Sequence, residues 1–168
     1  MNNAERQRKL ESWLENHQGL IFKIIRAYAF APHDREDLLQ EISIQLWDSI
    51  PRFKGKSAET TWIYRVALYA SIAWSKRERR HSDRSSEVEP MPLVDEPVED
   101  PRLGWLYAQL ATLEEIDRSL MLMLLDGMSY AEMANALGIS EQNVGVKIHR
   151  IKKVLVERSN RDGDRHEL

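Results

Sequence analysis

The sequence predicts an all-α protein built from two small helical domains. Apolar side chains recur every three or four residues through both halves of the 168-residue chain, which is the period of an amphipathic helix. Between the halves, residues 81–102 lose this period and hold four of the six prolines. We expect domains at 1–80 and 103–158, a flexible acidic, Pro-rich linker at 81–102 and a disordered tail at 159–168.

Composition narrows the class of protein. A hydrophobic fraction of 42% is enough for a folded core, and the absence of cysteine excludes disulfides, thiolate metal sites and Cys nucleophiles. The five histidines show no metal-ligand spacing, so no metal or other cofactor is predicted. No apolar run is long enough for a signal peptide or a membrane span. We therefore expect a cytoplasmic protein without direct membrane insertion.

The net charge of −3 conceals an uneven distribution. Residues 1–80 carry 14 Lys+Arg against 10 Asp+Glu, and residues 81–102 carry 2 against 7. Residues 142–158 are basic again, with five cations against one carboxylate. Two basic zones separated by an acidic segment indicate an anionic partner such as nucleic acid.

Three helices are expected in the first domain. Apolar residues mark one face through the first thirty residues, with Gly19 as a possible break. Asp34, with Asp37 three residues later, is the expected N-cap of a second helix that ends before the loop 51–57. Thr60–Arg80 forms the third. Its expected packing face holds Trp62, Ile63, Val66, Ala67, Ala70, Ala73 and Trp74, and its other face holds Thr61, Arg65, Leu68, Tyr69, Ile72, Lys76 and Arg79.

The second face of this helix has two interpretations. It is buried in a helical core with its basic end in water, or it binds single-stranded nucleic acid through rings that stack on bases and cations that follow phosphates. A helix lying on a membrane surface is disfavoured, because small alanines at 67, 70 and 73 are typical of close packing.

Capping signals divide the second domain into helices at about 113–126, 130–137 and 141–158. The expected N-caps are Thr112 with Glu115, Ser129 with Glu132, and Ser140 with Asn143, while Gly127 and Gly138 follow helix ends.

Residues 129–150 have the spacing of a helix-turn-helix, with a turn at 138–140. In that motif the start of the second helix enters the major groove, and the residues after it follow the DNA backbone. The alternative is a plain helical hairpin with a charged, solvated face. The residues expected to face DNA are Glu141, Gln142, Asn143, Lys147, Arg150, Lys152 and Lys153.

The order of these motifs resembles the extracytoplasmic-function sigma factors, which are two-domain initiation subunits of bacterial RNA polymerase. The resemblance rests on DREDLLQEISIQLW, RFKGKS, TTWIYRVA, KRERR, the acidic linker, and SYAEMANALGIS with NVGVKIHR. It covers about residues 10–157. The resemblance implies that the DREDLLQE helix docks on the clamp coiled coil of the largest polymerase subunit, which assigns Asp37, Gln40 and Glu41 to that contact. Helical spacing places Ile44 and Asp48 on the same face, away from the buried stripe. The alternative for this face is a solvated polar surface.

The resemblance also implies that the first domain melts and reads the promoter −10 element, with a base of the non-template strand flipped from the stack. The candidates are Arg52, Lys54, Lys56, Trp62, Arg65, Tyr69, Lys76, Arg79 and Arg80, although Trp62 can instead pack as scaffold. The family's usual Asn and Asp are replaced here by Tyr69 and Ala73, so the −10 sequence itself is not predicted. The helix-turn-helix would bind the −35 duplex.

The sequence thus predicts a non-enzymatic sigma factor that binds polymerase core and promoter DNA, together with an anti-sigma partner. The alternative is a stand-alone helix-turn-helix regulator whose first domain senses a ligand or dimerises. An enzyme has little support, because no Gly-rich phosphate loop, nucleophile elbow or ligand cluster is visible.

Overall fold

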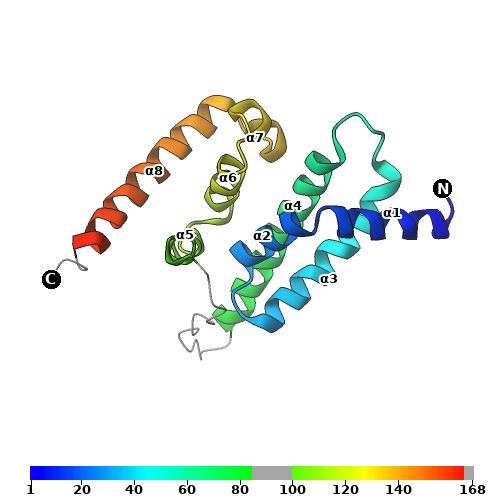
Figure 1. The fold of residues 1–168 in the computed structure, drawn as a ribbon, viewed down its shortest axis with the longest axis horizontal. Coiled ribbons are helices and arrows are strands. Elements are labelled where there is room, and N and C mark those ends of the chain that lie inside the picture. The colour runs from blue at the N-terminus through cyan, green and yellow to red at the C-terminus, as the bar shows by residue number, and fades with distance from the viewer. Residues whose placement is uncertain (85–99, 165–168) are drawn as a thin grey trace. The chain divides into compact units, whose positions relative to one another are not determined.

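The computed structural model describes residues 1–84 and 100–164, and within these ranges regular structure is entirely helical (Figure 1). The chain divides into two compact units, Met1–Tyr107 and Ala108–Leu168. The all-α prediction is confirmed. No helix in the described ranges is long and apolar enough to cross a membrane.

The first unit contains α1 (Asn3–Asn16), α2 (Gln18–Tyr28), α3 (Pro32–Ser49), a short 3-10 helix η1 (Ile50–Arg52) and α4 (Glu59–Arg84). α3 and α4 lie side by side, and α1 and α2 pack against them (Figure 1). The core at their junction is apolar and inaccessible to solvent, which fixes the spacing between α3 and α4. It includes Ile24, Leu38, Ile42, Leu46 and Ile63.

Two helix starts differ from the sequence prediction. The first helical segment breaks at His17, two residues before Gly19. α3 begins at Pro32, so Asp34 lies inside its first turn instead of capping it. Proline fits the first position of a helix because its missing N–H has no partner to lose there, and this preference overrides the capping signal of Asp34.

The second face of α4 is partly buried. Leu68 and Ile72 are only 1% and 7% exposed, as the buried interpretation of that face predicts. Ala73, assigned to the packing face, is exposed. The helix lies against both α2 and α3, so its buried stripe is wide, and beside the groove it is open around Tyr69.

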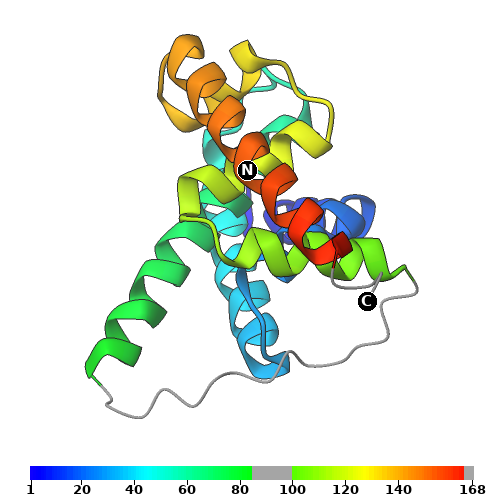
Figure 2. The same cartoon turned by 90° about the vertical axis from the view of Figure 1, so that its left-hand side faces the viewer.

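The second unit consists of the end of α5 (Pro101–Ala111), α6 (Glu115–Leu125), α7 (Tyr130–Leu137) and α8 (Glu141–Asp164). α7 packs against the start of α8 (Figure 2), and α6 lies against both. Large buried side chains hold these helices together, among them Leu110, Leu120, Met123, Met133 and Ile148.

The predicted capping box at Thr112 is wrong. The Thr112 hydroxyl donates to the carbonyl of Gln109 and closes the end of α5, so α6 begins only at Glu115, without a side-chain cap. A threonine hydroxyl can bond to the backbone of the helix before it or of the helix after it, and here it bonds to the helix before it, α5.

The predicted segment ends also shift. α4 continues to Arg84 and α5 begins at Pro101, so both edges of the expected linker are helical, while residues 85–99 lie outside the described residues. The expected disordered tail is helical as far as Asp164, because Arg158 ties α8 to Gln109 and Thr112 and no proline ends the helix. Residues 165–168 are not described.

Candidate nucleic-acid interface

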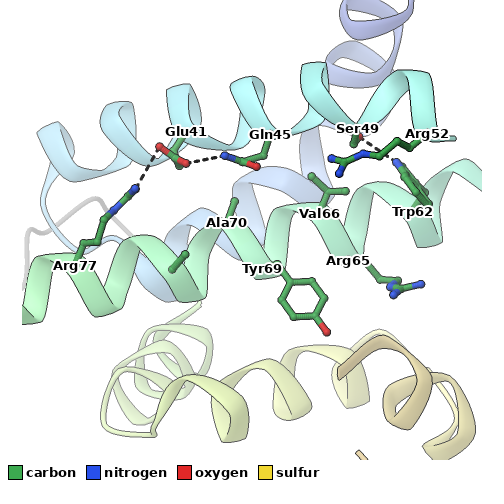
Figure 3. A pocket seen from close by; sticks show the side chains of 11 residues that line it. Glu41, Gln45, Ser49, Arg52, Trp62, Arg65, Val66, Tyr69, Ala70 and Arg77 are labelled. Atoms are coloured by element: carbon green, nitrogen blue, oxygen red, sulfur yellow. Dashed lines mark hydrogen bonds and ion pairs between the residues drawn. The ribbon is translucent and has the colours of Figure 1, made fainter. Parts of the chain in front are cut away.

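A groove of about 460 Å³ lies between α3 and α4 in the first unit (Figure 3). Its walls combine aromatic, cationic and small apolar side chains. They are Glu41, Gln45, Ser49 and Arg52 on one side, and Trp62, Arg65, Val66, Tyr69, Ala70, Ala73 and Arg77 on the other.

One end of the groove is closed by a neutral hydrogen bond. The Trp62 indole N–H donates to the Ser49 hydroxyl at 3.0 Å, and Ser49, which is buried, donates in turn to the carbonyl of Leu46. A tryptophan whose N–H is used in this way is held in one orientation. Trp62 therefore serves as scaffold here, which is the second of its two expected roles.

The other end is closed by an ion pair. Arg77 of α4 lies 3.2 Å from the carboxylate of Glu41, which also accepts a hydrogen bond from Gln45 at 3.1 Å (Figure 3). Glu41, expected on the polymerase-binding face, thus points into the groove. Its side chain links the two helices that line it.

Between these ends the groove opens to solvent around Tyr69, which is 46% exposed. Figure 3 shows Tyr69 and Arg65 pointing away from α3. Arg52 is exposed at the mouth. An exposed ring with guanidinium groups beside it can stack on a base while the cations contact phosphate.

The loop between η1 and α4 carries Lys54 and Lys56, which are both exposed. It turns at Gly55, whose φ of +67° is readily adopted by glycine. Phe53 anchors the loop between two tryptophans, with ring centroids 5.5 Å from Trp13 and 5.6 Å from Trp62. The loop cations therefore project from a fixed aromatic base.

An ion pair from α1 reinforces this anchor. Lys9 pairs with Glu59 at the start of α4, and its ammonium lies 5.3 Å and 5.5 Å from the ring centroids of Trp13 and Phe53. The hydrogen bond from Lys9 holds the pKa of Glu59 below its ordinary value of 4.5. α1 thus braces both ends of the loop.

The remaining candidates on α4 lie beyond the groove. Lys76, Arg79 and Arg80 are exposed on the last turns of the helix, which diverge from α3 in Figure 2. These cations are accessible to a long anionic ligand that extends past the groove.

The outer face of α3 carries the other expected surface. Asp37, Gln40 and Asp48 are exposed, and Ile44 is 55% exposed among them. Asp48 pairs with Arg6 at 3.2 Å, and the same guanidinium donates to the carbonyl of Trp47 near the end of α3. The face is a polar strip around one exposed isoleucine, without Glu41.

In the second unit the helix-turn-helix has the predicted caps. Ser129 and Glu132 form a reciprocal capping box on α7, Gly138 ends α7 in the left-handed conformation, and Ser140 accepts the N–H of Asn143 at the start of α8. The two helices of the motif meet through an apolar contact. Its buried members include Met133, Ala134, Leu137, Val144 and Ile148.

The first turn of α8 leaves three of the expected base-facing residues, Glu141, Gln142 and Asn143, exposed. Val144 is buried beneath them, which fixes the rotation of the helix. Lys152 and Lys153 are exposed further along. This is the distribution that a helix needs in order to present its start to base edges and its later turns to phosphates.

Lys147 and Arg150 differ from the other cations of α8. Both donate to the carboxylate of Asp117 on α6, at 2.9 Å and 3.0 Å. Asp117 was not a candidate residue in the sequence prediction, because its partners lie 30 and 33 residues away and no local pattern links them.

Comparison with known proteins assigns both units. Residues 13–81 match the family model for Sigma-70 region 2, and residues 103–155 match that for Sigma-70, region 4. The chain is 34% identical over 146 residues to the ECF RNA polymerase sigma factor SigF of Caulobacter vibrioides, covering 82% of this chain and 77% of that one. The chain belongs to the ECF sigma factors.

Other relatives carry similar names. The ECF sigma factor SigX of Bacillus subtilis is 30% identical over 131 residues, covering 71% of this chain and 68% of its own. SigG of Mycobacterium tuberculosis is 28% identical, and the match spans 73% of this sigma factor but 41% of that longer protein.

Two solved structures share the fold. CnrH in complex with the cytosolic domain of CnrY has a TM-score of 0.66 at 19% identity, over 93% of this chain and 90% of that one. The sigma factor RpoE in complex with the anti-sigma factor NepR from Bartonella quintana has a TM-score of 0.63 at 18% identity, over 89% and 96%. The two helical domains of this sigma factor thus follow a known architecture.

Family membership shows that the two units act together in transcription initiation. An ECF sigma factor directs RNA polymerase to promoters, which removes the stand-alone regulator as the interpretation of the helix-turn-helix. Within residues 1–84 and 100–164 no group of three or more His, Asp or Glu side chains could hold a metal ion.

Proposed function

We propose that the first unit of this sigma factor opens and reads the −10 element, while the helix-turn-helix binds the −35 duplex. The observation that carries the proposal is the groove between α3 and α4, which is closed at both ends and lined by exposed Tyr69 together with Arg65 and Arg52. Neither role requires a catalysed reaction by this chain.

The −10 site follows from the shape of this groove. A flipped base needs a pocket and a stacking partner to offset the cost of leaving the duplex, which is a few kcal/mol. Tyr69 supplies an exposed ring, and Trp62 keeps the groove wall in place. The strand is contacted by Arg65, by Arg52 at the end of η1, and by the loop cations Lys54 and Lys56. Its path continues along α4 past Lys76, Arg79 and Arg80.

The −35 site is the exposed start of α8. Gln142 and Asn143 present amide groups, which recognise base edges through paired donors and acceptors. Glu141 can accept from a cytosine amino group. Lys152 and Lys153 contribute phosphate contacts that strengthen binding to any sequence.

The polymerase core binds the outer strip of α3, through Asp37, Gln40, Ile44 and Asp48. An exposed isoleucine surrounded by polar side chains is the usual arrangement at the centre of a protein interface. Glu41, which the resemblance also assigned to this contact, is engaged by Arg77 and acts by joining α3 to α4.

An anti-sigma factor is the expected regulatory partner. Of the two similar structures, RpoE is bound to the anti-sigma factor NepR, and CnrH is bound to the cytosolic domain of CnrY. A partner that covers the groove or the α3 strip would block DNA or core, respectively. Because core polymerase and the genome are its targets, we place the protein in the bacterial cytoplasm.

Run-off transcription with core polymerase on a genomic fragment library tests the proposal. The expected result is initiation at a small set of sites that depends on added protein. Initiation that is indifferent to the protein, or tight sequence-specific binding to duplex promoters without core, would contradict the proposal.

A charge reversal separates core binding from the rest. Asp37→Lys should weaken the affinity for core about tenfold or more, since like charges at an interface cost several kcal/mol. Glu36→Lys is the matched control, because it changes the same charge on the neighbouring exposed position. Equal core affinity for the two variants would remove Asp37 from the interface.

A further inference from the structure

Asp117 is a carboxylate that is nearly buried between two helices of the second unit. It lies in the first turn of α6, where the helix dipole favours a negative charge, and its side chain is only 12% exposed. One carboxylate oxygen accepts from the Lys147 ammonium at 2.9 Å, and the other accepts from the Arg150 guanidinium at 3.0 Å. Both donors belong to the recognition helix α8.

The two donors differ in how far they can leave Asp117. The Lys147 side chain is 26% exposed, so its ammonium lies in the contact between α6 and α8. The Arg150 side chain is 62% exposed and reaches the carboxylate from the solvent side. A long, mostly exposed guanidinium can exchange this carboxylate for a DNA phosphate, whose oxygens also accept charge-assisted hydrogen bonds from arginine.

We propose that Asp117 competes with DNA phosphate for the cations of the recognition helix and so restrains binding that is independent of sequence. Lys147 is held as a structural cation between α6 and α8, and Arg150 exchanges between Asp117 and a phosphate of the DNA backbone. The contacts that read bases at the start of α8 then contribute a larger share of the binding energy. This inference rests on the proposed function, since it requires α8 to bind duplex DNA.

The salt dependence of DNA binding measures this competition directly. Each phosphate that a protein neutralises releases counterions and adds about 0.9 to the slope of log K against log salt. The full-length chain is titrated against a fluorescently labelled DNA duplex of arbitrary sequence at several salt concentrations. This probe needs no knowledge of the promoter.

Asp117→Asn is the main variant, because asparagine keeps the shape and one acceptor oxygen but removes the charge. We expect its slope to be steeper by about 1 and its affinity at low salt to rise several-fold. Glu114→Gln removes the same charge from an exposed position of the same segment and should leave the slope unchanged.

Lys147→Met is a second variant, and its result in the otherwise native protein does not depend on whether Asp117→Asn folds. It should leave the slope of the otherwise native protein unchanged, and should lower it by about 0.9 in the Asp117→Asn background. Lys152→Met, on the exposed part of α8, should lower the slope by about 0.9 in either background.

The outcomes separate the two proposals. An unchanged slope in Asp117→Asn, or a weaker affinity with native circular dichroism, overturns the role of Asp117 while Lys152→Met still reports DNA binding. A lower slope in Lys147→Met alone also overturns it. If Lys152→Met and Lys153→Met have no effect, α8 is not the duplex-binding surface and the proposed function of the second unit fails as well.

Discussion

The two surfaces that we propose bind DNA are supported in different ways. In the first unit, the groove is held by Trp62 and Ser49 and by aromatic packing around Phe53, while Tyr69 and Arg52 remain open. In the second unit, Lys147 and Arg150 of the recognition helix are themselves tied to the scaffold by Asp117. In the first unit, the side chains that hold the surface together differ from those available to bind DNA. In the second unit, the same side chains do both.

This difference determines how each surface responds to mutation. The neutral contacts of Trp13, Phe53 and Trp62 can be altered without changing the charge of the binding surface, so stability and binding are separable there. In the second unit a change at one cation alters helix packing and DNA affinity together. The predictions below test this separation.

Trp13→Ala should have the largest effect. Trp13 is 1% exposed and packs edge-on against Phe53, so its loss leaves a cavity beneath the −10 loop that costs about 3–5 kcal/mol. Urea unfolding followed by circular dichroism measures the loss. Phe22→Ala, which removes an aromatic ring that is 46% exposed, should cost much less.

The loss of stability in Trp13→Ala should be confined to the first unit. Binding of Trp13→Ala to duplex DNA through the helix-turn-helix should stay near that of the native protein under conditions where the second unit is folded. A parallel loss of duplex binding would show that the two surfaces are not independently supported.

Tyr69→Ala should impair promoter opening without affecting stability. Stacking of one base on an aromatic ring is worth about 1–3 kcal/mol, or about five- to 150-fold in the equilibrium for the open complex. Fluorescence of 2-aminopurine in the non-template strand reports opening in the holoenzyme. Tyr69→Phe keeps the ring and should retain most of the activity, and native behaviour of both variants would mean that Tyr69 only fills space.

Sequence patterns predicted what depends on neighbours along the chain. The reciprocal cap of Ser129 and Glu132 and the left-handed Gly138 are local, and the structure has both. The predicted Thr112 cap was also local but wrong, because the Thr112 hydroxyl donates to the carbonyl of Gln109 in the helix before it.

Contacts between distant residues carried no such signal. Arg6 is 41 residues from the Trp47 carbonyl it binds, and Asp117 is 30 residues from Lys147. The two interpretations of the face with Leu68 and Ile72 stayed open for the same reason, because a helical period cannot show that two other helices cover α4. Periodicity therefore located the surfaces, and tertiary contacts decided which side chains are available on them.

Gly145→Ala tests whether the recognition helix needs a close approach to DNA. An added Cβ would lie 3.5 Å from the Tyr130 ring, an ordinary contact, so the protein itself does not require glycine there. Alanine should raise the free energy of unfolding by about 0.5–1 kcal/mol. Unchanged duplex affinity is expected, and a selective loss of affinity would instead place DNA against this position.

Glu59→Gln should have the smallest effect, and its dependence on pH identifies the cause. Lys9 lowers the pKa of Glu59 below 4.5, so the stabilisation is complete above about that pH and is lost as the pH falls through the lowered value. At neutral pH the variant should lose less than about 1 kcal/mol, because both side chains are about two-fifths exposed and solvent screens the pair. Native protein and variant should then converge in acid and in high salt. A difference that persists at low pH would mean that Glu59 supports the loop through its shape and hydrogen bonding, and would extend the neutral scaffold of the first unit to the start of α4.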